Sequence, residues 1–187
     1  MEAGPAGTVD VVPTAVDRVS RLVRDVPDFP VPGITFRDIT PLLGDAQGLA
    51  DAVTGVAEPW VGAGVTVVAG VEARGFIVAT PVALHLGAGF VPVRKPGKLP
   101  WQVEREDYDL EYGSDALELH ADAVGPGDRV LVVDDVLATG GTAAAAVRLV
   151  ERLGATVLGV AVLIELVALG GRSRLPGRDV TALLIEG

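Results

Sequence analysis

Residues 130–142 read Val130-Leu131-Val132-Val133-Asp134-Asp135-Val136-Leu137-Ala138-Thr139-Gly140-Gly141-Thr142. The first four residues are apolar, as in a strand that is buried on both faces, and a helical pattern begins at Thr142. Two carboxylates and a loop of small residues therefore stand between a buried strand and the start of a helix. Because ligands of open α/β sheets bind at the carboxyl ends of the strands, this stretch predicts a binding site.

The loop after the two aspartates has the composition of a phosphate site. Its paired glycines allow backbone N–H groups to turn toward an anion, its threonines supply hydroxyls, and the following helix directs its positive end to the same place. Asp134 and Asp135 would repel a phosphate beside them, so they suit sugar hydroxyls or the water shell of a divalent cation. A strand–turn–helix corner without a ligand is the alternative, but two adjacent acids followed by Thr-Gly-Gly-Thr favour the functional interpretation.

The rest of the chain alternates apolar runs of strand length with helical patterns. Strands are expected at 65–69, 90–93, 116–120, 130–133, 156–163 and 180–185, and helices at 12–23, 49–60, 75–86 and 142–153. This alternation predicts a single α/β domain over residues 11–187, with a mostly parallel central sheet flanked by helices.

Three segments lie outside this alternation. Residues 1–10 are small, acidic and contain glycine and proline, and we expect a disordered leader there. Prolines stiffen residues 27–38 into an extended segment. Residues 96–113 combine glycine, proline and charge with Trp101, Tyr108 and Tyr112, and a loop of this length in a compact domain is usually functional or disordered.

The composition of the 187 residues excludes several classes of protein. Hydrophobic residues make up 49% of the chain, yet no apolar run reaches the roughly 18 residues of a membrane-spanning helix. The net charge of −10 is unsuited to general binding of nucleic acid, and the lack of cysteine excludes disulfides and thiolate metal sites. Without a secretory signal, the expected compartment is the cytoplasm. Arg94, Lys95 and Lys98 form a basic cluster that suits either an anion site or a solvated loop.

Residues 130–142 resemble the phosphoribosyl pyrophosphate loop of the type I phosphoribosyltransferases. Further segments are similar to the branch of that family that acts on adenine, and they run in order through residues 29–38, 72–76, 91–100 and 108–113. The resemblance extends from about Val19 to about Gly171, with departures in the leader and at residues 172–187. It implies the fold of that family, in which residues 27–38 form an N-terminal hood and residues 96–113 a flexible lid loop.

The resemblance also implies a reaction. The phosphoribosyl group of phosphoribosyl pyrophosphate would pass to adenine in purine salvage, giving AMP and pyrophosphate. Mg²⁺ would be bound mainly through pyrophosphate and ribose, without a dedicated set of protein ligands, and the chain would form a homodimer. Since such a reaction passes through an oxocarbenium-like transition state, it needs a held sugar phosphate, a neutralised leaving group and a site without water.

By the same resemblance, each site residue has an expected role. Ala138, Thr139, Gly140, Gly141 and Thr142 would hold the 5′-phosphate, Asp134 and Asp135 the ribose hydroxyls, and Arg74, Arg94 and Lys98 the pyrophosphate. Glu111 would be the general acid or base that serves the purine ring, chosen by resemblance among acids that include Glu104, Glu106, Asp107 and Asp109. Adenine would stack on Phe36, and the backbone of Thr35 and Arg37 would read its edge; the alternative for Phe36 is a place in the core.

Two alternatives remain open from the sequence. The base could be a 6-oxopurine or orotate, although 6-oxopurine enzymes present a lysine after the phosphate loop and this chain has no lysine after Lys98. Arg172, Arg174 or Arg178 could replace that lysine. A regulator that binds phosphoribosyl pyrophosphate without catalysis is the second alternative, but a DNA-binding regulator would need a basic helix-turn-helix extension, and the leader is short and acidic.

Overall fold

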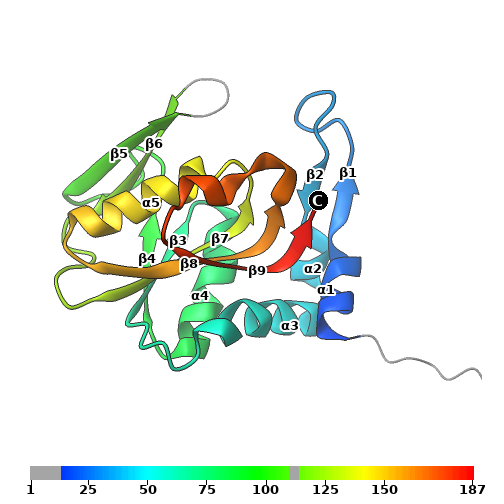
Figure 1. The fold of residues 1–187 in the computed structure, drawn as a ribbon, viewed down its shortest axis with the longest axis horizontal. Coiled ribbons are helices and arrows are strands. Elements are labelled where there is room, and N and C mark those ends of the chain that lie inside the picture. Colours follow the sequence, from blue (N-terminus) through cyan, green and yellow to red (C-terminus); the bar gives the residue numbers. More distant parts are fainter. Residues whose placement is uncertain (1–13, 110–113) are drawn as a thin grey trace, which may run out of the picture.

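The computed structural model describes residues 14–109 and 114–187. Within these residues, five parallel strands form a central sheet in the order β4-β3-β7-β8-β9 (Figure 1). They are β3 (Val67–Val71), β4 (Gly89–Val93), β7 (Arg129–Leu137), β8 (Thr156–Leu166) and β9 (Asp179–Glu186). The predicted α/β fold with a mostly parallel central sheet is confirmed, and the strand expected at 180–185 is the edge strand β9.

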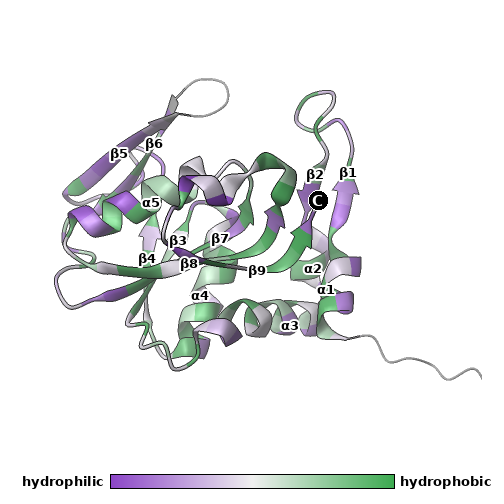
Figure 2. Cartoon of the chain, viewed as in Figure 1, coloured by the Kyte–Doolittle hydropathy of each residue, from purple (hydrophilic) through white to green (hydrophobic). Residues whose placement is uncertain are grey.

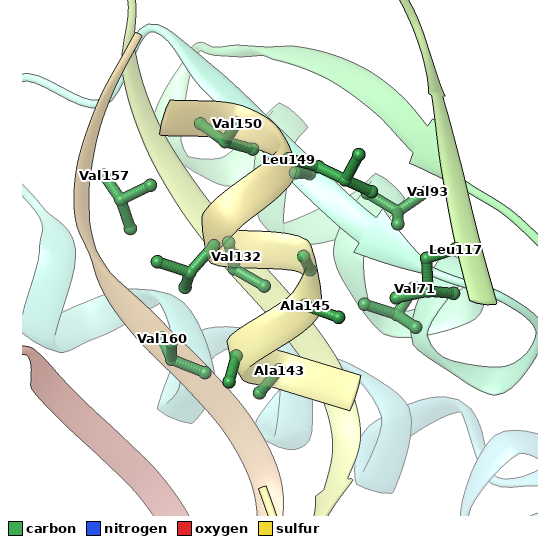
Figure 3. Close-up of a cluster of buried hydrophobic side chains, with 14 of the residues drawn as sticks. Val71, Val93, Leu117, Val132, Ala143, Ala145, Leu149, Val150, Val157 and Val160 are labelled. Atoms are coloured by element: carbon green, nitrogen blue, oxygen red, sulfur yellow. The ribbon is translucent and has the colours of Figure 1, made fainter. Parts of the chain in front are cut away.

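Helices cover both faces of the sheet, as the apolar residues of its strands require. On one face, α5 (Gly141–Arg152) packs into a buried cluster that includes Val132 and Val160 (Figure 3). Residues of α1 (Ala15–Leu22), α2 (Thr40–Gly44), α3 (Ala46–Ala57) and α4 (Arg74–Leu86) belong to the second buried cluster. Successive residues of β7 alternate between the two clusters, so Val132 joins the first and Val133 the second. This burial on both faces explains the continuous apolar run in the sequence.

Local signals determine where the helices begin and end. Asp45 begins α3, because its carboxylate accepts a hydrogen bond of 2.6 Å from the N–H of Gly48. Gly87 ends α4 with a φ of +66°, a conformation that favours glycine. The predicted helices correspond to α1, α3, α4 and α5, whereas the short helix α2 was not predicted.

The segment at 27–38 lies within a hairpin that the sequence analysis did not identify. β1 (Arg24–Val26) pairs antiparallel with β2 (Phe36–Asp38), and the prolines lie in the connection between them. In Figure 1 this hairpin stands beside the end of β9. Arg37 joins the two, because its guanidinium pairs with Asp25 of β1 and its Nε lies 2.5 Å from Oε2 of Glu186 in β9. The hairpin is therefore tied to the edge of the central sheet.

The second half of the segment at 96–113 differs from the expected loop. β5 (Val103–Asp109) pairs antiparallel with β6 (Ser114–His120), and together they form an arm beside α5 (Figure 1). Figure 2 shows that β5 is hydrophilic, unlike the strands of the central sheet. Its inward residue Glu106 pairs with Arg148 and Arg152 of α5. The strand was missed because ion pairs, and not apolar burial, hold most of it against the helix.

The two tryptophans of the chain lie in contrasting environments. Trp60, which ends the short 3₁₀ helix η1 (Glu58–Trp60), is 6% exposed, and its indole N–H donates a 2.9 Å hydrogen bond to Thr181 of β9. Its ring occupies the space above Gly159, where a Cβ would collide with it. Trp101, just before the arm, is 65% exposed.

Among the described helices, none has the length and apolar character needed to cross a membrane.

Candidate active site

A cavity of about 450 Å³ lies at the carboxyl ends of β3 and β7. It is lined by Glu72, Ala73, Arg74, Lys95, Tyr108, Asp115, Leu117, Asp134, Asp135, Val136, Ala138 and Thr142. The structure thus brings together five of the residues expected at the site, which are Arg74, both adjacent aspartates and two members of the phosphate loop. These residues come from two separate parts of the chain, after β3 and at the end of β7, and meet because the parallel strands end at one edge of the sheet.

The phosphate loop at residues 138–142 forms a recess beside this cavity. Gly140 has a φ of +80° and immediately precedes α5, so the loop turns sharply into the helix. The N–H groups of the first helical turn have no partners within the helix, and the helix dipole adds positive potential there. Backbone and hydroxyl donors around this recess are suited to a phosphate group.

Asp134 and Asp135 leave the end of β7 in different environments. The N–H of Asp135 donates a 2.9 Å hydrogen bond to Oδ1 of Asp134. The residue Asp134 is partly exposed, but protein atoms surround its carboxyl: a Cβ added at Gly75 would lie 2.7 Å from Oδ1. Loss of hydration, followed by the nearby charge of Asp135, raises the pKa of Asp134 well above the ordinary value of an aspartate. Asp135 is buried and lies 2.7 Å from Nε of Arg74.

Arg74 connects the aspartates to the hairpin. It begins α4, directly after the cis peptide between Glu72 and Ala73. Its guanidinium lies over the ring of Phe36, 4.6 Å from the centroid. Phe29 packs edge-on against the same ring at 5.2 Å, and Phe36 is only half-buried. Phe36 therefore faces the site and does not belong to the buried core.

The residues of the basic cluster, Arg94, Lys95 and Lys98, lie in different places relative to the cavity. Arg94 is held by Glu72, with Nε 3.2 Å from Oε2, and its Nη1 donates to the backbone oxygen of Lys98. Neither Arg94 nor Lys98 lines the cavity. Lys95 does line it, and its Nζ lies 2.5 Å from Oδ2 of Asp115. From the sequence, Lys95 belongs to the basic cluster but is not among the expected site residues.

Tyr108 links the arm to the phosphate loop and was also missed. It is 7% exposed, and burial raises the pKa of its hydroxyl. The hydroxyl of Thr142 donates to Tyr108 at 3.4 Å, and Tyr108 donates in turn to Asp115 at 3.3 Å. A buried tyrosine needs partners for its hydroxyl, but nothing in the sequence showed that Thr142, 34 residues away, would be one of them.

Several expected residues lie elsewhere or cannot be placed. Glu111 and the leader at 1–10 lie outside the described residues. Thr35 is exposed in the hairpin connection. Two of the other acids considered for this role have cationic partners: Glu104 lies 3.9 Å from Arg152, and Asp107 pairs with Arg105. In the described part of the chain, no group of three or more histidine, aspartate or glutamate side chains is arranged to hold a metal ion.

Comparisons with known proteins agree with this geometry. The model of the phosphoribosyl transferase domain matches residues 43–179. The adenine phosphoribosyltransferase of Thermobifida fusca is 58% identical over 165 residues, which cover 88% of this chain and 94% of the relative. The crystal structure of the Rhodothermus marinus enzyme of that name superposes with a TM-score of 0.88 at 54% identity, covering 91% of this chain and 98% of that one. A Saccharomyces cerevisiae structure, complexed with an imino-altritol bisphosphate and adenine, has a TM-score of 0.87 at 38% identity, with 91% and 98% covered.

Proposed function

Because the chain belongs to the phosphoribosyltransferase family, within its adenine phosphoribosyltransferases, we propose a specific role for each part of the cavity in that reaction. The chain transfers the phosphoribosyl group of phosphoribosyl pyrophosphate to adenine, giving AMP and pyrophosphate, in purine salvage. One observation carries the assignment of roles: two residues of the phosphate loop, the paired aspartates and Arg74 line one cavity, and Arg74 lies over Phe36.

Residues 138–142 hold the 5′-phosphate through their backbone N–H groups and threonine hydroxyls. Support comes from the left-handed Gly140, which turns the loop into the N-terminus of α5. Asp134 and Asp135 bind the ribose hydroxyls next to this loop. As the bond to pyrophosphate lengthens, positive charge develops on the ribose ring, and carboxylates fixed nearby stabilise it.

Arg74 binds the departing pyrophosphate together with the basic segment at 94–98. Lys95 lines the cavity and can contact the pyrophosphate directly. Arg94 and Lys98 are proposed to attract the pyrophosphate as neighbouring cations, since Arg94 is bonded to Glu72, which lines the cavity. When bound, Mg²⁺ neutralises the charge of the pyrophosphate, and the adjacent carboxylates of Asp134 and Asp135 fit its water shell. The cation would be bound mainly through pyrophosphate and ribose.

Adenine stacks on Phe36, and the backbone of Thr35 and Arg37 reads its edge. Adenine offers an amino donor at position 6 and an acceptor at N1, whereas hypoxanthine offers the reverse. A backbone N–H and C=O that match adenine would face like groups in hypoxanthine, at a cost of about 1–3 kcal/mol for each mispaired group. Of Arg172, Arg174 and Arg178, which could have replaced the lysine of 6-oxopurine enzymes, the first and the last are paired with Glu165 and Glu151. These pairs favour adenine.

Glu111 is the proposed general acid or base for the purine ring, carried by the lid at 96–113. Closure of the lid would exclude the water that otherwise hydrolyses the activated sugar. Since Tyr108, near the turn end of the arm, contacts Thr142, the lid and the phosphate loop are already joined there. The proposed domain organisation also includes the leader at 1–10 and the hood at 27–38. A cytoplasmic location is proposed from the sequence alone.

The proposed assembly is a homodimer that uses the outer face of α4. Ile77 and Leu84 lie seven residues apart on this helix, on one face, and are 44% and 77% exposed. Exposed apolar side chains on one face of a helix are suited to a contact with another protein chain. A dimer through this face would bring a second chain close to Arg74, which begins the same helix.

A panel of bases tests the proposed function. The protein is mixed with phosphoribosyl pyrophosphate, Mg²⁺ and adenine, hypoxanthine, guanine or orotate, and pyrophosphate release is measured. We expect kcat/KM for adenine to exceed the values for the other bases by at least about a hundredfold. Comparable rates with hypoxanthine would overturn recognition by the hairpin backbone. Binding of phosphoribosyl pyrophosphate without release of pyrophosphate with any base would instead indicate a regulator.

A further inference from the structure

The back of the phosphate loop rests on a segment from the far end of the chain. Gly171 begins the 3₁₀ helix η3 (Gly171–Arg174) and is buried. A Cβ added there would lie less than 3.0 Å from the backbone oxygen of Ala138, and one added at Gly140 would lie equally close to the oxygen of Gly171. These two stretches of backbone touch with no side chain between them. A shift of Gly171 must therefore move the phosphate loop.

Arg172 fixes the position of Gly171. Its Nε and Nη2 each lie 2.6 Å from an oxygen of the Glu165 carboxylate, and its Nη1 donates to the backbone oxygen of Val180 at 2.8 Å. Glu165, in β8, is 4% exposed. It is also the register partner of Leu137, the residue of β7 that immediately precedes the phosphate loop. Arg172 thus joins β8 and β9 at the place where the loop leaves the sheet.

The ion pair between Glu165 and Arg172 is suited to fixing the position of the backbone. Neither Glu165 nor Arg172 lines the substrate cavity, so neither is placed to touch the reacting atoms. A buried carboxylate is costly unless it is well paired, and an apolar pair could fill the same volume at less cost. What the planar fork of arginine adds is a fixed direction for two parallel hydrogen bonds. That direction sets the path of the backbone at Gly171.

We propose that Glu165, Gly171 and Arg172 form a clamp of positioning residues that holds the phosphate loop in its binding geometry before the substrate arrives. The inference rests on the proposed role of residues 138–142 in binding the 5′-phosphate. Donors held in place beforehand bind a phosphate without the cost of ordering the loop. Loosening the clamp should therefore weaken binding of the sugar phosphate and leave the base site unchanged.

The first test replaces one glycine and uses another as its control. Gly171→Ala pushes the backbone away from Ala138, whereas Gly44→Ala introduces a methyl group into open space on α2. For Gly171→Ala we expect KM for phosphoribosyl pyrophosphate to rise between about 10- and 100-fold, as for a displaced positioning group. Binding of ribose 5-phosphate, measured by calorimetry, should weaken in parallel, and KM for adenine should stay within about twofold of wild type.

The second test removes the ion pair. Arg172→Lys keeps the charge without the fork, and the double variant Glu165→Gln/Arg172→Gln leaves no buried unpaired charge, which protects the fold. Arg178→Gln is the control, because it removes a neighbouring arginine–glutamate pair that does not touch the loop. We expect KM for phosphoribosyl pyrophosphate to rise in both clamp variants and not in Arg178→Gln. KM for phosphoribosyl pyrophosphate should stay closer to the wild-type value in Arg172→Lys than in the double glutamine variant.

The outcomes separate the clamp from the function on which it rests. If the wild-type protein releases no pyrophosphate with adenine, the proposed function fails. If the wild type is active but Gly171→Ala and Arg172→Lys match their controls in both KM values, the clamp is wrong. A lower melting temperature with unchanged KM values would equally overturn it, because the pair would then serve stability alone.

Discussion

The guanidinium carbon of Arg74 lies 4.6 Å from the centroid of the Phe36 ring. One of these residues is the proposed ligand of pyrophosphate and the other the proposed stacking partner of adenine. Nε of Arg74 also lies 2.7 Å from Asp135, a proposed ribose ligand. In this conformation Arg74 thus covers parts of both proposed substrate sites. Adenine can stack on the covered face of Phe36 only after Arg74 has moved, and a bound pyrophosphate would draw Arg74 away.

The first prediction concerns adenine binding without phosphoribosyl pyrophosphate. Replacement of Arg74 by alanine should strengthen this binding by about 2- to 30-fold, since a cation–π contact of about 0.5–2 kcal/mol no longer competes with the base. The same variant should lose kcat/KM for the complete reaction. Calorimetric titration with adenine measures the first effect, and Arg94→Ala, whose guanidinium is not over Phe36, is the control. Equal or weaker adenine binding to Arg74→Ala would refute the competition.

The second prediction links stability to pH through Asp134. Because its pKa is raised in the folded state, Asp134 stabilises the fold fully only below the unfolded value of about 3.8, and this contribution is lost as the pH rises through the folded pKa. The melting temperature of Asp134→Asn relative to wild type should therefore be higher at pH 7–8 than at pH 3.5, while turnover falls. Thermal melts across this pH range measure the difference. A difference that is constant with pH would show that the carboxyl is not buried as described.

Asp135→Asn is the matched control for that experiment. Its carboxylate pairs with Arg74, so its loss should lower the melting temperature at pH 7 and also impair turnover. Near-wild-type rates in both asparagine variants would remove the proposed role of the aspartates in binding ribose.

The third prediction identifies the general acid or base. Glu111→Gln should keep the fold and lower kcat by about 10²–10⁴, the usual worth of a positioned proton donor or acceptor. Glu104→Gln is the control, because Glu104 is partly exposed and lies 3.9 Å from Arg152 at the edge of an ion pair. Rate assays and melts of both variants decide the matter. A loss below about threefold, together with greater harm from Glu104→Gln, would show that another carboxylate acts.

The fourth prediction concerns the contact between the hairpin and β9. Glu186→Gln removes one partner of Arg37, whose backbone is proposed to read the base. A partly exposed ion pair is worth up to about 1 kcal/mol, so KM for adenine should rise by up to about fivefold, with KM for phosphoribosyl pyrophosphate unchanged. Asp51→Asn, which breaks the pair with Arg18 on the helical layer, is the control. If KM for phosphoribosyl pyrophosphate rises instead, Glu186 does not act through the hairpin.

The central sheet could be predicted because its strands are buried on both faces. Val130 to Val133 and Thr156 to Leu163 are almost uninterrupted apolar runs, which a parallel sheet between helices requires. β5 gave no such signal, since Glu106 is held by arginines of α5. The β1–β2 hairpin was hidden for a related reason: both strands are short, β1 is mostly exposed and β2 is only half-buried, so neither has an apolar run.

The candidate site could be located from the sequence where its residues are contiguous. Asp134 to Thr142 form one uninterrupted motif, and the structure places them at one edge of the sheet. Lys95 could have been recognised, because it belongs to the basic cluster, but sequence alone does not show which of three cations faces inward. The contacts of Tyr108 with Thr142 and of Gly171 with Ala138 join residues more than 30 positions apart. No local pattern records such contacts.

The contrasting environments of Trp60 and Trp101 give this protein two separate optical signals. Trp60 is enclosed by the sheet and bonded to Thr181, so its emission should be blue-shifted and should change only when the sheet unfolds. Trp101 stands in solvent before the arm, so its emission should be red-shifted and open to quenching by iodide. With Trp60→Phe and Trp101→Phe as single-tryptophan versions, movement of the arm upon addition of substrate can be followed in real time without an attached dye. Loss of the fold would be recorded in the same cuvette as a distinct change.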